Sequence, residues 1–198
     1  MISNAPKVPE LSRHAAEEFA TKWKNTKEEK QFAESFWNDF FRNLCGVEDP
    51  QVAGIEFQKP VKNSVSGNTN YLDVYWKDVA LIEHKSSGES LDKAYLQAKG
   101  YWRSLPKGYR PKWIILCNFQ YFRLVNVDLN RTYDFALSEL SENIYRFEGI
   151  ISGNLTRIAE NEITVDQVAA KLMANLYLEL SEYGFDGSVA QSFIFVLA

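Results

Sequence analysis

The sequence predicts an α/β domain followed by a helical extension. Apolar residues repeat with helical spacing near the N-terminus, several short segments in the middle have the period or composition of strands, and helical spacing returns towards the end. With 198 residues, of which 45% are hydrophobic, the chain can bury one substantial core. We therefore expect one α/β domain over residues 1–155 and a helical segment over residues 156–198.

The composition restricts the class of protein. Five Trp, ten Tyr and thirteen Phe supply more apolar surface than a disordered chain carries. The net charge of −4 argues mildly against tight DNA binding by this chain alone, because phosphate neutralisation needs clustered Lys and Arg. Cys45 and Cys117 lie far apart without CxxC spacing, which favours a reducing cytoplasm over a disulfide framework or a zinc site. We expect no membrane partner, because no apolar run approaches the roughly 18 residues of a span.

Two helices are expected first. Residues 11–23 form one, and the second begins near Thr26, where Thr26 and Glu29 can form a capping box. The second helix has an aromatic stripe that widens to about half its circumference. The residues that define this stripe repeat every four positions: Phe32, Phe36, Phe40 and Leu44.

The middle of the chain alternates strands with one helix. A polar loop over residues 58–70 separates the first two strands, and a helix from about Glu89 to Leu105 separates the third from the fourth. Beyond Asp134 we expect a short helical stretch, a loop near residues 149–153 and a long amphipathic helix. The expected strands are residues 52–57, 71–76, 79–85, 113–119 and 121–127.

The chain ends in an apolar run at residues 193–198. Natural termini are usually polar and loosely held, so this run predicts a truncation where another domain begins. A C-terminal helix docked into the core is the alternative interpretation.

Three polar residues in neighbouring strands have a spacing that suits catalysis. Asp73 lies in one expected strand, and Glu83 and Lys85 lie near the end of the next. Strand residues alternate between two faces, so Glu83 and Lys85 share one face and His84 points to the other. Charged residues are depleted in strands, which makes this strand end unusual. A strand that simply emerges into solvent is the alternative interpretation.

The register of the two strands decides whether the acids meet. Alternation puts Asp73 and Tyr75 on one face of the first strand and Leu72 on the other. A two-residue turn would set Asp73 opposite Ile82, whereas a three-residue connection or a bulge would set it opposite Glu83. The hypothesis of a joint site therefore requires an odd connection or a bulge.

Such a site suits a divalent ion. Two carboxylates held close together repel each other unless a cation lies between them, and Mg²⁺ prefers oxygen ligands. The ion polarises a phosphate and lowers the pKa of its bound water, while a neighbouring lysine orients that water and neutralises charge. This is the inventory of phosphodiester hydrolysis. The spacing alone is common, since Glu28-Glu29-Lys30 also fits Glu-x-Lys on a helix face that we expect to be solvated.

Other residues are weaker candidates. Gln97 and Tyr101 lie four apart at one edge of the apolar stripe of the helix over residues 89–105, and Glu34 borders the aromatic stripe. All three also suit ordinary positions at the boundary of a buried face. The His84 side chain is expected to pack or to form a hydrogen bond rather than to act as a base.

Together these residues resemble the PD-(D/E)xK nuclease superfamily. Asp73, Glu83 and Lys85 match its three signature positions, and Gln97 and Tyr101 match the Gln-x-x-x-Tyr element of one branch. The resemblance implies a restriction-endonuclease-like core, in which a mixed central sheet is flanked by helices.

The resemblance also assigns roles to individual residues. It implies that Asp73, Glu83 and the backbone carbonyl of His84 ligate Mg²⁺. It places Glu34 where many members carry an extra acid on the first core helix, so that Glu34 joins the catalytic set. Leu72 stands where the superfamily is named for a proline, a position that varies among its members.

More narrowly, residues 1–155 resemble the N-terminal domain of Type IIG/IIL restriction enzymes of the MmeI-like group. The aromatic second helix, the Asp73-x₉-Glu83-x-Lys85 spacing and residues 112–118 carry this resemblance. It implies that residues 156–198 begin a helical connector, and that the partners are double-stranded DNA and the methyltransferase and target-recognition domains of the same chain. No S-adenosylmethionine-binding or Asn-Pro-Pro-Tyr motif occurs here, so that cofactor belongs to sequence beyond this chain.

The sequence thus predicts a Mg²⁺-dependent DNA endonuclease domain of a fused restriction-modification enzyme. Two alternatives stay open. One is a repair-type nuclease acting on DNA ends, which would need no recognition sequence. The other is a non-catalytic DNA-binding or interaction module, which would have no reason to keep two repelling acids.

Overall fold

The computed structural model describes residues 11–62, 67–152, 173 and 176–177. Contacts divide the chain into two units, Met1–Asn154 and Leu155–Ala198. In the second unit only Met173, Leu176 and Tyr177 are described, and all three are helical. The expected helical connector and the apolar end of the chain lie outside the described residues, and the account below concerns the first unit.

The first unit is built on a six-stranded sheet whose spatial order follows the chain, β1-β2-β3-β4-β5-β6. Neighbouring strands are antiparallel except β3 and β4, which are parallel and connected through α3 (Leu91–Ser104). The strands are β1 (Ile55–Lys62), β2 (Thr69–Trp76), β3 (Ala80–His84), β4 (Trp113–Cys117), β5 (Tyr121–Asn126) and β6 (Arg131–Ala136). The fold is therefore the mixed α/β arrangement that the sequence predicts.

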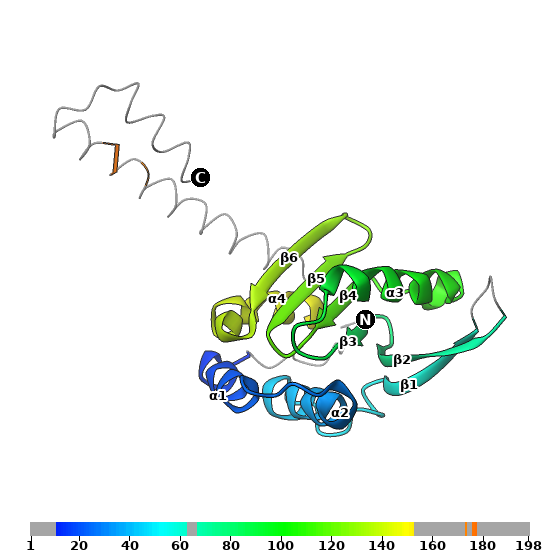
Figure 1. The fold of residues 1–198 in the computed structure, drawn as a ribbon, viewed down its shortest axis with the longest axis horizontal. Helices are drawn as coiled ribbons and strands as arrows, with labels where there is room; N and C mark the ends of the chain where they lie inside the picture. Colours follow the sequence, from blue (N-terminus) through cyan, green and yellow to red (C-terminus); the bar gives the residue numbers. More distant parts are fainter. Residues whose placement is uncertain (1–10, 63–66, 153–172, 174–175, 178–198) are drawn as a thin grey trace, which may run out of the picture. The chain divides into compact units, whose positions relative to one another are not determined.

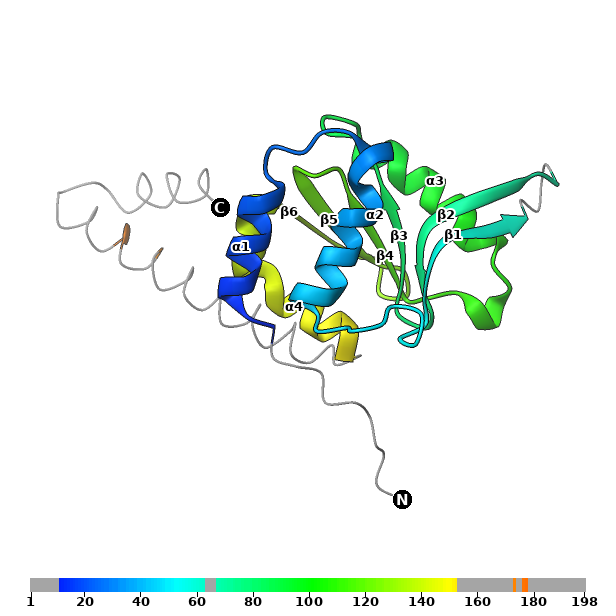
Figure 2. The ribbon, with the colours of Figure 1, turned by 90° about the horizontal axis from the view of Figure 1, so that it is seen from below.

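Helices cover both faces of the sheet (Figures 1 and 2). α3 lies on one face, and α1 (Arg13–Trp23), α2 (Glu29–Asp39) and α4 (Leu140–Ser152) lie on the other. α2 continues as one π-helical turn, Phe40–Leu44. Short 3₁₀ turns occupy Lys107–Tyr109 and Leu137–Glu139. None of the helices in the described part of the chain has the length and apolarity needed to cross a bilayer.

The face covered by α2 has an aromatic core. Phe36 is fully buried, and its ring meets those of Trp37, Phe119 and Phe122 with centroid distances of 5.3, 5.4 and 6.1 Å. Phe147 of α4 closes the layer at 5.6 Å from Phe122. The helical spacing of the aromatic residues thus fixes how α2 sits on the sheet, because one stripe carries nearly all of its buried surface.

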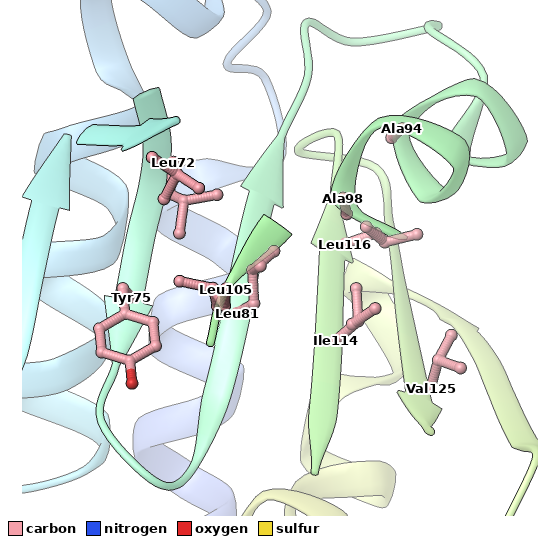
Figure 3. Packing of buried hydrophobic residues seen from close by; sticks show 10 residues of the cluster. Leu72, Tyr75, Leu81, Ala94, Ala98, Leu105, Ile114, Leu116 and Val125 are labelled. Atoms are coloured by element: carbon pink, nitrogen blue, oxygen red, sulfur yellow. The ribbon is translucent and has the colours of Figure 1, made fainter. Parts of the chain in front are cut away.

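The opposite face packs against α3 through small residues. Ala94 and Ala98 are fully buried and let the helix backbone approach the sheet closely. They belong to the same buried cluster as the strand residues Leu81, Ile114 and Leu116, and Ala98 lies next to Leu116 (Figure 3). This contact sets the height of α3 above the strand that carries Glu83.

Several sequence expectations are wrong in detail. Of the loop expected at residues 58–70, residues 58–62 and 69–70 are strand, because β1 and β2 pair as far as Lys62 and Thr69, and residues 63–66 lie outside the described residues. Their distal halves pair only with each other and extend past the rest of the sheet, so polar side chains are tolerated there (Figure 2). A sixth strand, β6, was not expected, because an edge strand with mostly exposed residues lacks an apolar pattern. α4 replaces the loop expected near residues 149–153, running to Ser152.

The expected capping box at the start of α2 is also absent. The N-cap is Glu28 and makes no side-chain capping bond. Instead the Glu29 amide donates to the Ser86 hydroxyl at 3.3 Å, and the Ser87 amide donates to the Lys27 carbonyl at 2.9 Å. A tertiary contact with the loop after β3 thus provides a hydrogen-bond acceptor for the Glu29 amide at the start of α2, in place of a local capping side chain.

The aromatic layer yields a stability prediction. Replacing Phe36 by Ala should lower the free energy of unfolding by about 3–5 kcal/mol, because the ring is buried among other rings that cannot all collapse into the cavity. Urea denaturation followed by tryptophan fluorescence measures the change. Leu96→Ala is the control, since Leu96 is 72% exposed on α3 and its truncation should cost no more than about 0.5 kcal/mol. Equal losses in the two variants would contradict this account of the core.

Candidate functional site

The connection between β2 and β3 has the odd length that a joint acidic site requires. Three residues, 77–79, join the strands, and Asp78 takes a positive φ of 62° in the turn. The Val79 amide closes the turn on the Trp76 carbonyl at 3.0 Å. β2 and β3 pair with Val74 opposite Ile82, so the register leads Asp73 towards Glu83.

Asp73 lies where β2 parts from β3. The backbone amide of His84 donates to Asp73 Oδ2 at 2.7 Å, and the next amide, that of Lys85, donates to Cys117 of β4 at 2.8 Å. The Asp73 carboxylate therefore takes a place that a strand carbonyl would occupy in a continuous ladder. A carboxylate held by a backbone amide has little freedom to turn away from the strand end.

The alternation expected in β2 does not hold at this point. Leu72 packs in the same α3-side cluster as Tyr75, although residues three apart should face opposite ways. The expectation that Leu72 points away from the Tyr75 face is therefore wrong. The two halves of β2 are therefore turned relative to each other near Asp73, whose side chain accepts from the His84 amide.

Glu83 is the most deeply buried acid of the group, with 1% of its surface exposed. Its Oε1 accepts from the Lys85 ammonium at 2.6 Å, whereas Oε2 is buried without a hydrogen-bond partner. Buried polar atoms normally have partners. Burial, and then the charge of Asp73, raise the pKa of Glu83 to about 8. Burial likewise raises the pKa of Asp73, although the His84 amide and Lys85 partly oppose it.

Lys85 is the counter-charge of the site. Burial alone would lower the pKa of its ammonium, but the hydrogen bond and charge of Glu83 outweigh burial, and the pKa is raised. The Lys85 side chain is 16% exposed, so its charge is only partly screened by water. The Lys85 side chain therefore stays charged at neutral pH and attracts anions to the strand end.

The His84 side chain packs as expected. Its Nδ1 accepts from the Trp37 indole at 3.1 Å, and its ring lies 4.2 Å from that of Phe119. Burial, and then the charge of Lys85, lower the pKa of His84 to about 3. The imidazole is a neutral part of the aromatic core and does not face Glu83 and Lys85.

Gln97 and Tyr101 border the site from α3. The Gln97 amide donates to the Tyr101 hydroxyl at 2.8 Å. Burial raises the pKa of Tyr101, the Gln97 hydrogen bond opposes this, and the charges of Glu83 and Lys85 also act on the hydroxyl. The structure thus brings this pair within electrostatic range of the strand residues.

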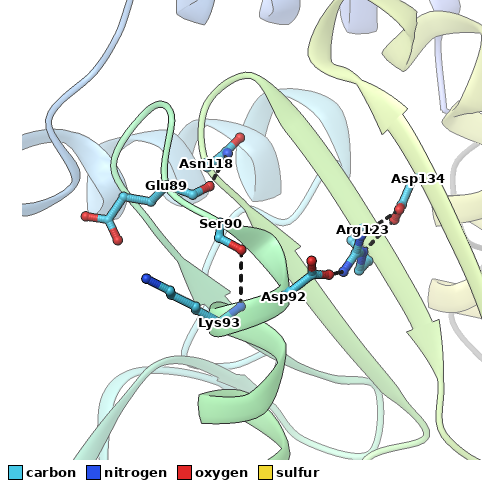
Figure 4. Close-up of polar contacts among 7 residues, drawn as sticks. All are labelled: Glu89, Ser90, Asp92, Lys93, Asn118, Arg123 and Asp134. Carbon is cyan, nitrogen blue, oxygen red and sulfur yellow. Dashed lines mark hydrogen bonds and ion pairs between the residues drawn. The ribbon is translucent and has the colours of Figure 1, made fainter.

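α3 is fixed to the sheet at its N-terminal end (Figure 4). Ser90 caps the helix by accepting from the Lys93 amide at 3.5 Å, and Asn118 donates to the Glu89 carbonyl at 2.8 Å. Arg123 of β5 binds Asp134 of β6 through two hydrogen bonds of 2.7 and 2.8 Å, and it also binds Asp92 of α3. These contacts hold the helix that carries Gln97 and Tyr101.

A pocket opens beside Asp73 on the α2 side. Glu34 lines it, as do two residues that the sequence did not assign to the site, Glu29 and Gln58. Burial raises the pKa of Glu29, the charge of Lys85 opposes this rise and the charge of Asp73 adds to it, and the charge of Glu29 in turn raises the pKa of Glu83. Glu29 is therefore the acid of α2 that is coupled to the strand residues.

Sequence patterns gave no way to find Glu29. We assigned it to a solvated helix face and to a local cap. Its position depends on the contact between the start of α2 and the loop after β3, which joins residues 57 positions apart. Gln58 escaped notice because its strand was expected to be a loop.

The oxygen atoms at the strand end fit a hard divalent ion. They include the unpartnered Glu83 Oε2, the carboxylate of Asp73 and the backbone carbonyl that follows Glu83. Within the residues that the structure describes, no three Asp, Glu, His or Cys side chains are gathered as a ready-made metal cluster. Mg²⁺ commonly takes one or two carboxylates and completes its shell with water and phosphate, so a pair of acids suffices.

The fold defines a class: an α/β domain with a mixed six-stranded sheet flanked by helices. A family model described as "MmeI, N-terminal domain" matches residues 14–183. The chain belongs to this family.

A solved structure described as "cryoEM structure DrdV-DNA complex" is similar, with a TM-score of 0.49 and 14% sequence identity. The similarity covers 87% of this chain and 17% of that chain. Among curated proteins no match is found.

The buried acids predict an unusual pH dependence of stability. A carboxyl whose pKa is about 8 when folded and 4.5 ordinarily binds its proton more tightly in the folded state. Stability should therefore fall as pH rises from about 5 to 8. In EDTA the melting temperature should drop over this window by about 3 °C or more beyond the drop of Glu83→Gln, which cannot ionise at this position.

Added Mg²⁺ should raise the melting temperature of the natural chain more at pH 8 than at pH 5, because the ion favours the ionised acids. Differential scanning calorimetry measures both effects. Identical pH profiles for the natural chain and Glu83→Gln would show that Glu83 does not titrate as inferred.

Proposed function

We propose that this chain is a Mg²⁺-dependent DNA endonuclease domain that hydrolyses phosphodiester bonds. The observation that carries the proposal is a buried glutamate, Glu83, whose Oε2 lacks a partner while Asp73 and Lys85 share its strand end. Burying a carboxyl oxygen without a partner destabilises a fold. The cost is offset when a cation binds that oxygen. Membership of the MmeI N-terminal domain family supports a place within a restriction enzyme.

Each residue has a distinct role in this proposal. Asp73, Glu83 and the His84 carbonyl hold the ion, and when bound the ion supplies Lewis-acid activation of water and phosphate. Lys85 is an ammonium at neutral pH, so its role is to orient the attacking water and to neutralise the negative charge that develops on the phosphate. Gln97 and Tyr101 position Lys85 or a phosphate oxygen from α3.

The acids of α2 supply a further oxygen. Sequence resemblance assigns this role to Glu34, which lines the pocket beside Asp73. The charge coupling of Glu29 to Asp73, Glu83 and Lys85 makes Glu29 the better candidate. We propose that Glu29 holds a bridging water or a second ion, and that Glu34 lies at the rim of the same pocket.

The remaining parts of the enzyme are proposals that rest on the family. This chain spans 17% of the length of the DrdV chain that it resembles, and that structure is described as a DNA complex. We propose that double-stranded DNA is the substrate, that residues 156–198 begin a helical connector, and that a methyltransferase using S-adenosylmethionine and a target-recognition domain follow in the complete protein. Cytoplasmic localisation is part of the same proposal.

The proposal predicts loss of cleavage without loss of folding. Asp73→Ala and Lys85→Ala should each reduce cleavage of supercoiled plasmid in Mg²⁺ by at least about 100-fold, because each removes charge stabilisation that develops in the transition state. The assay is run on this chain and on the complete protein. Circular dichroism checks that the variants stay folded, and the exposed residues Glu17 and Lys24, each replaced by Ala, provide controls of matched charge.

Isothermal titration with Mg²⁺ and Mn²⁺ separates the proposal from its alternatives. The natural chain should bind an ion, and Glu83→Gln should bind it at least about 10-fold more weakly. Absence of ion binding by the natural chain would favour a non-catalytic DNA-binding module. Cleavage that begins at free DNA ends and needs no recognition sequence in the complete protein would favour a repair-type nuclease.

A further inference from the structure

Gln58 has a backbone conformation that its place in the fold does not explain. Its φ is 50°, in the left-handed region that non-glycine residues rarely adopt. The other described non-glycine residues with positive φ are Asp78, Phe119 and Asn130, and all three lie in turns or bends. Gln58 alone among them lies inside a strand, β1. Strain of this kind persists where the surrounding structure imposes it, and it concentrates at functional sites.

The strain does not come from an inserted residue. Phe57 pairs with Val74 and Lys59 pairs with Leu72, so the register is the same on both sides of Gln58. A β-bulge would have shifted it by one. Gln58 therefore lies directly across from Asp73, and the distortion changes the direction of side chains without changing the pairing.

Both strands switch faces at this pair. In β1, Phe57 contacts Phe41 of the α2 side with ring centroids 6.3 Å apart, whereas Val61, four residues on, joins the α3-side cluster. Residues four apart in a regular strand share a face. In β2, Leu72 and Tyr75 share the α3 side although they are three apart. The left-handed conformation of Gln58 exchanges the two faces of the hairpin, so that side chains before and after this residue point to opposite sides from those expected. Asp73 lies at the position of this exchange.

The Gln58 side chain also reaches Asp73. Burial raises the pKa of the Asp73 carboxyl, and the Gln58 side chain is, after the His84 amide and Lys85, the third group that opposes this rise. The His84 amide holds Oδ2 of the same carboxylate at 2.7 Å from the other strand. Asp73 is thus held from both neighbouring strands, and Gln58 lines the pocket that it shares with Glu29 and Glu34.

We infer that Gln58 is a positioning residue of the site. Its left-handed backbone turns the β1–β2 hairpin over at Asp73, and its amide holds the Asp73 carboxylate towards the strand end where Glu83 and Lys85 lie. The inference deepens the proposed function and rests on it where the ion is concerned. The arrangement of Asp73 itself is a property of the fold and can be tested without an ion.

Two substitutions separate the backbone role from the amide role. Gln58→Gly accepts positive φ without strain but lacks the amide, so it should raise the melting temperature by about 2–4 °C while weakening Mg²⁺ binding about 10-fold or more. Gln58→Asn tolerates positive φ and keeps an amide, so it should bind Mg²⁺ within about 3-fold of the natural chain. Calorimetric melting and isothermal titration with Mg²⁺ are the measurements.

Asn130→Gly is the matched control. Asn130 also has a positive φ, of 51°, but lies in the turn between β5 and β6. This variant should leave Mg²⁺ affinity unchanged. If Gln58→Gly binds Mg²⁺ as tightly as the natural chain, or if Gln58→Asn is as weak as Gln58→Gly, the positioning role is wrong.

A measurement without metal distinguishes failure of this inference from failure of the proposed function. Hydrogen exchange of the His84 amide, followed by NMR in EDTA, reports how firmly Asp73 is held. Exchange should be at least about 5-fold faster in Gln58→Gly than in the natural chain, with little change in Asn130→Gly. Unchanged exchange in Gln58→Gly overturns the inference. Faster exchange in a chain that binds no Mg²⁺ upholds it and leaves the proposed function refuted.

Discussion

The hydrogen bond from the His84 amide to the Asp73 carboxylate organises the candidate site. It forms where β2 leaves β3, so an acid side chain takes the place of a strand carbonyl. The neighbouring strand pair, β3 and β4, continues past this point, since the Lys85 amide bonds to Cys117. Because β2 and β3 separate here while β3 and β4 remain paired, the acids Asp73 and Glu83 lie at the point of separation and the core of the sheet is kept.

Much of this arrangement follows from local sequence. The positions of Asp73 and Glu83 within strands, of Lys85 directly after β3, the need for an odd connection and the aromatic stripe of α2 are all consequences of period and turn length, which act over a few residues. The packed state of His84 follows from the same alternation. These features could be read from the chain because the polypeptide between the residues concerned is short and regular.

Other features depend on contacts between distant segments. Glu29 reaches the site because the loop after β3 binds the start of α2, and no local pattern encodes that contact. The change of face at Gln58 and Asp73 violates the alternation on which strand predictions rest, so side-chain directions on either side of this pair cannot be predicted from the sequence. Places where local rules break down are expected to coincide with functional or strained positions. β6 was missed for a plainer reason, since an exposed edge strand has little apolar periodicity.

The clamp at Arg123 has a consequence for how the molecule responds to acidity. Its partners Asp134 and Asp92 raise the pKa of a guanidinium that is already charged throughout the biological range. The contact between Asp92 of α3 and Arg123 therefore persists while the buried carboxyl of Glu83 gains or loses its proton. Gln97 and Tyr101 are therefore carried on a helix whose attachment to Arg123 does not depend on the protonation of Glu83, whose pKa burial raises to about 8. The ion pair that attaches α3 to the sheet and the carboxyl group of Glu83 therefore respond to pH independently of each other.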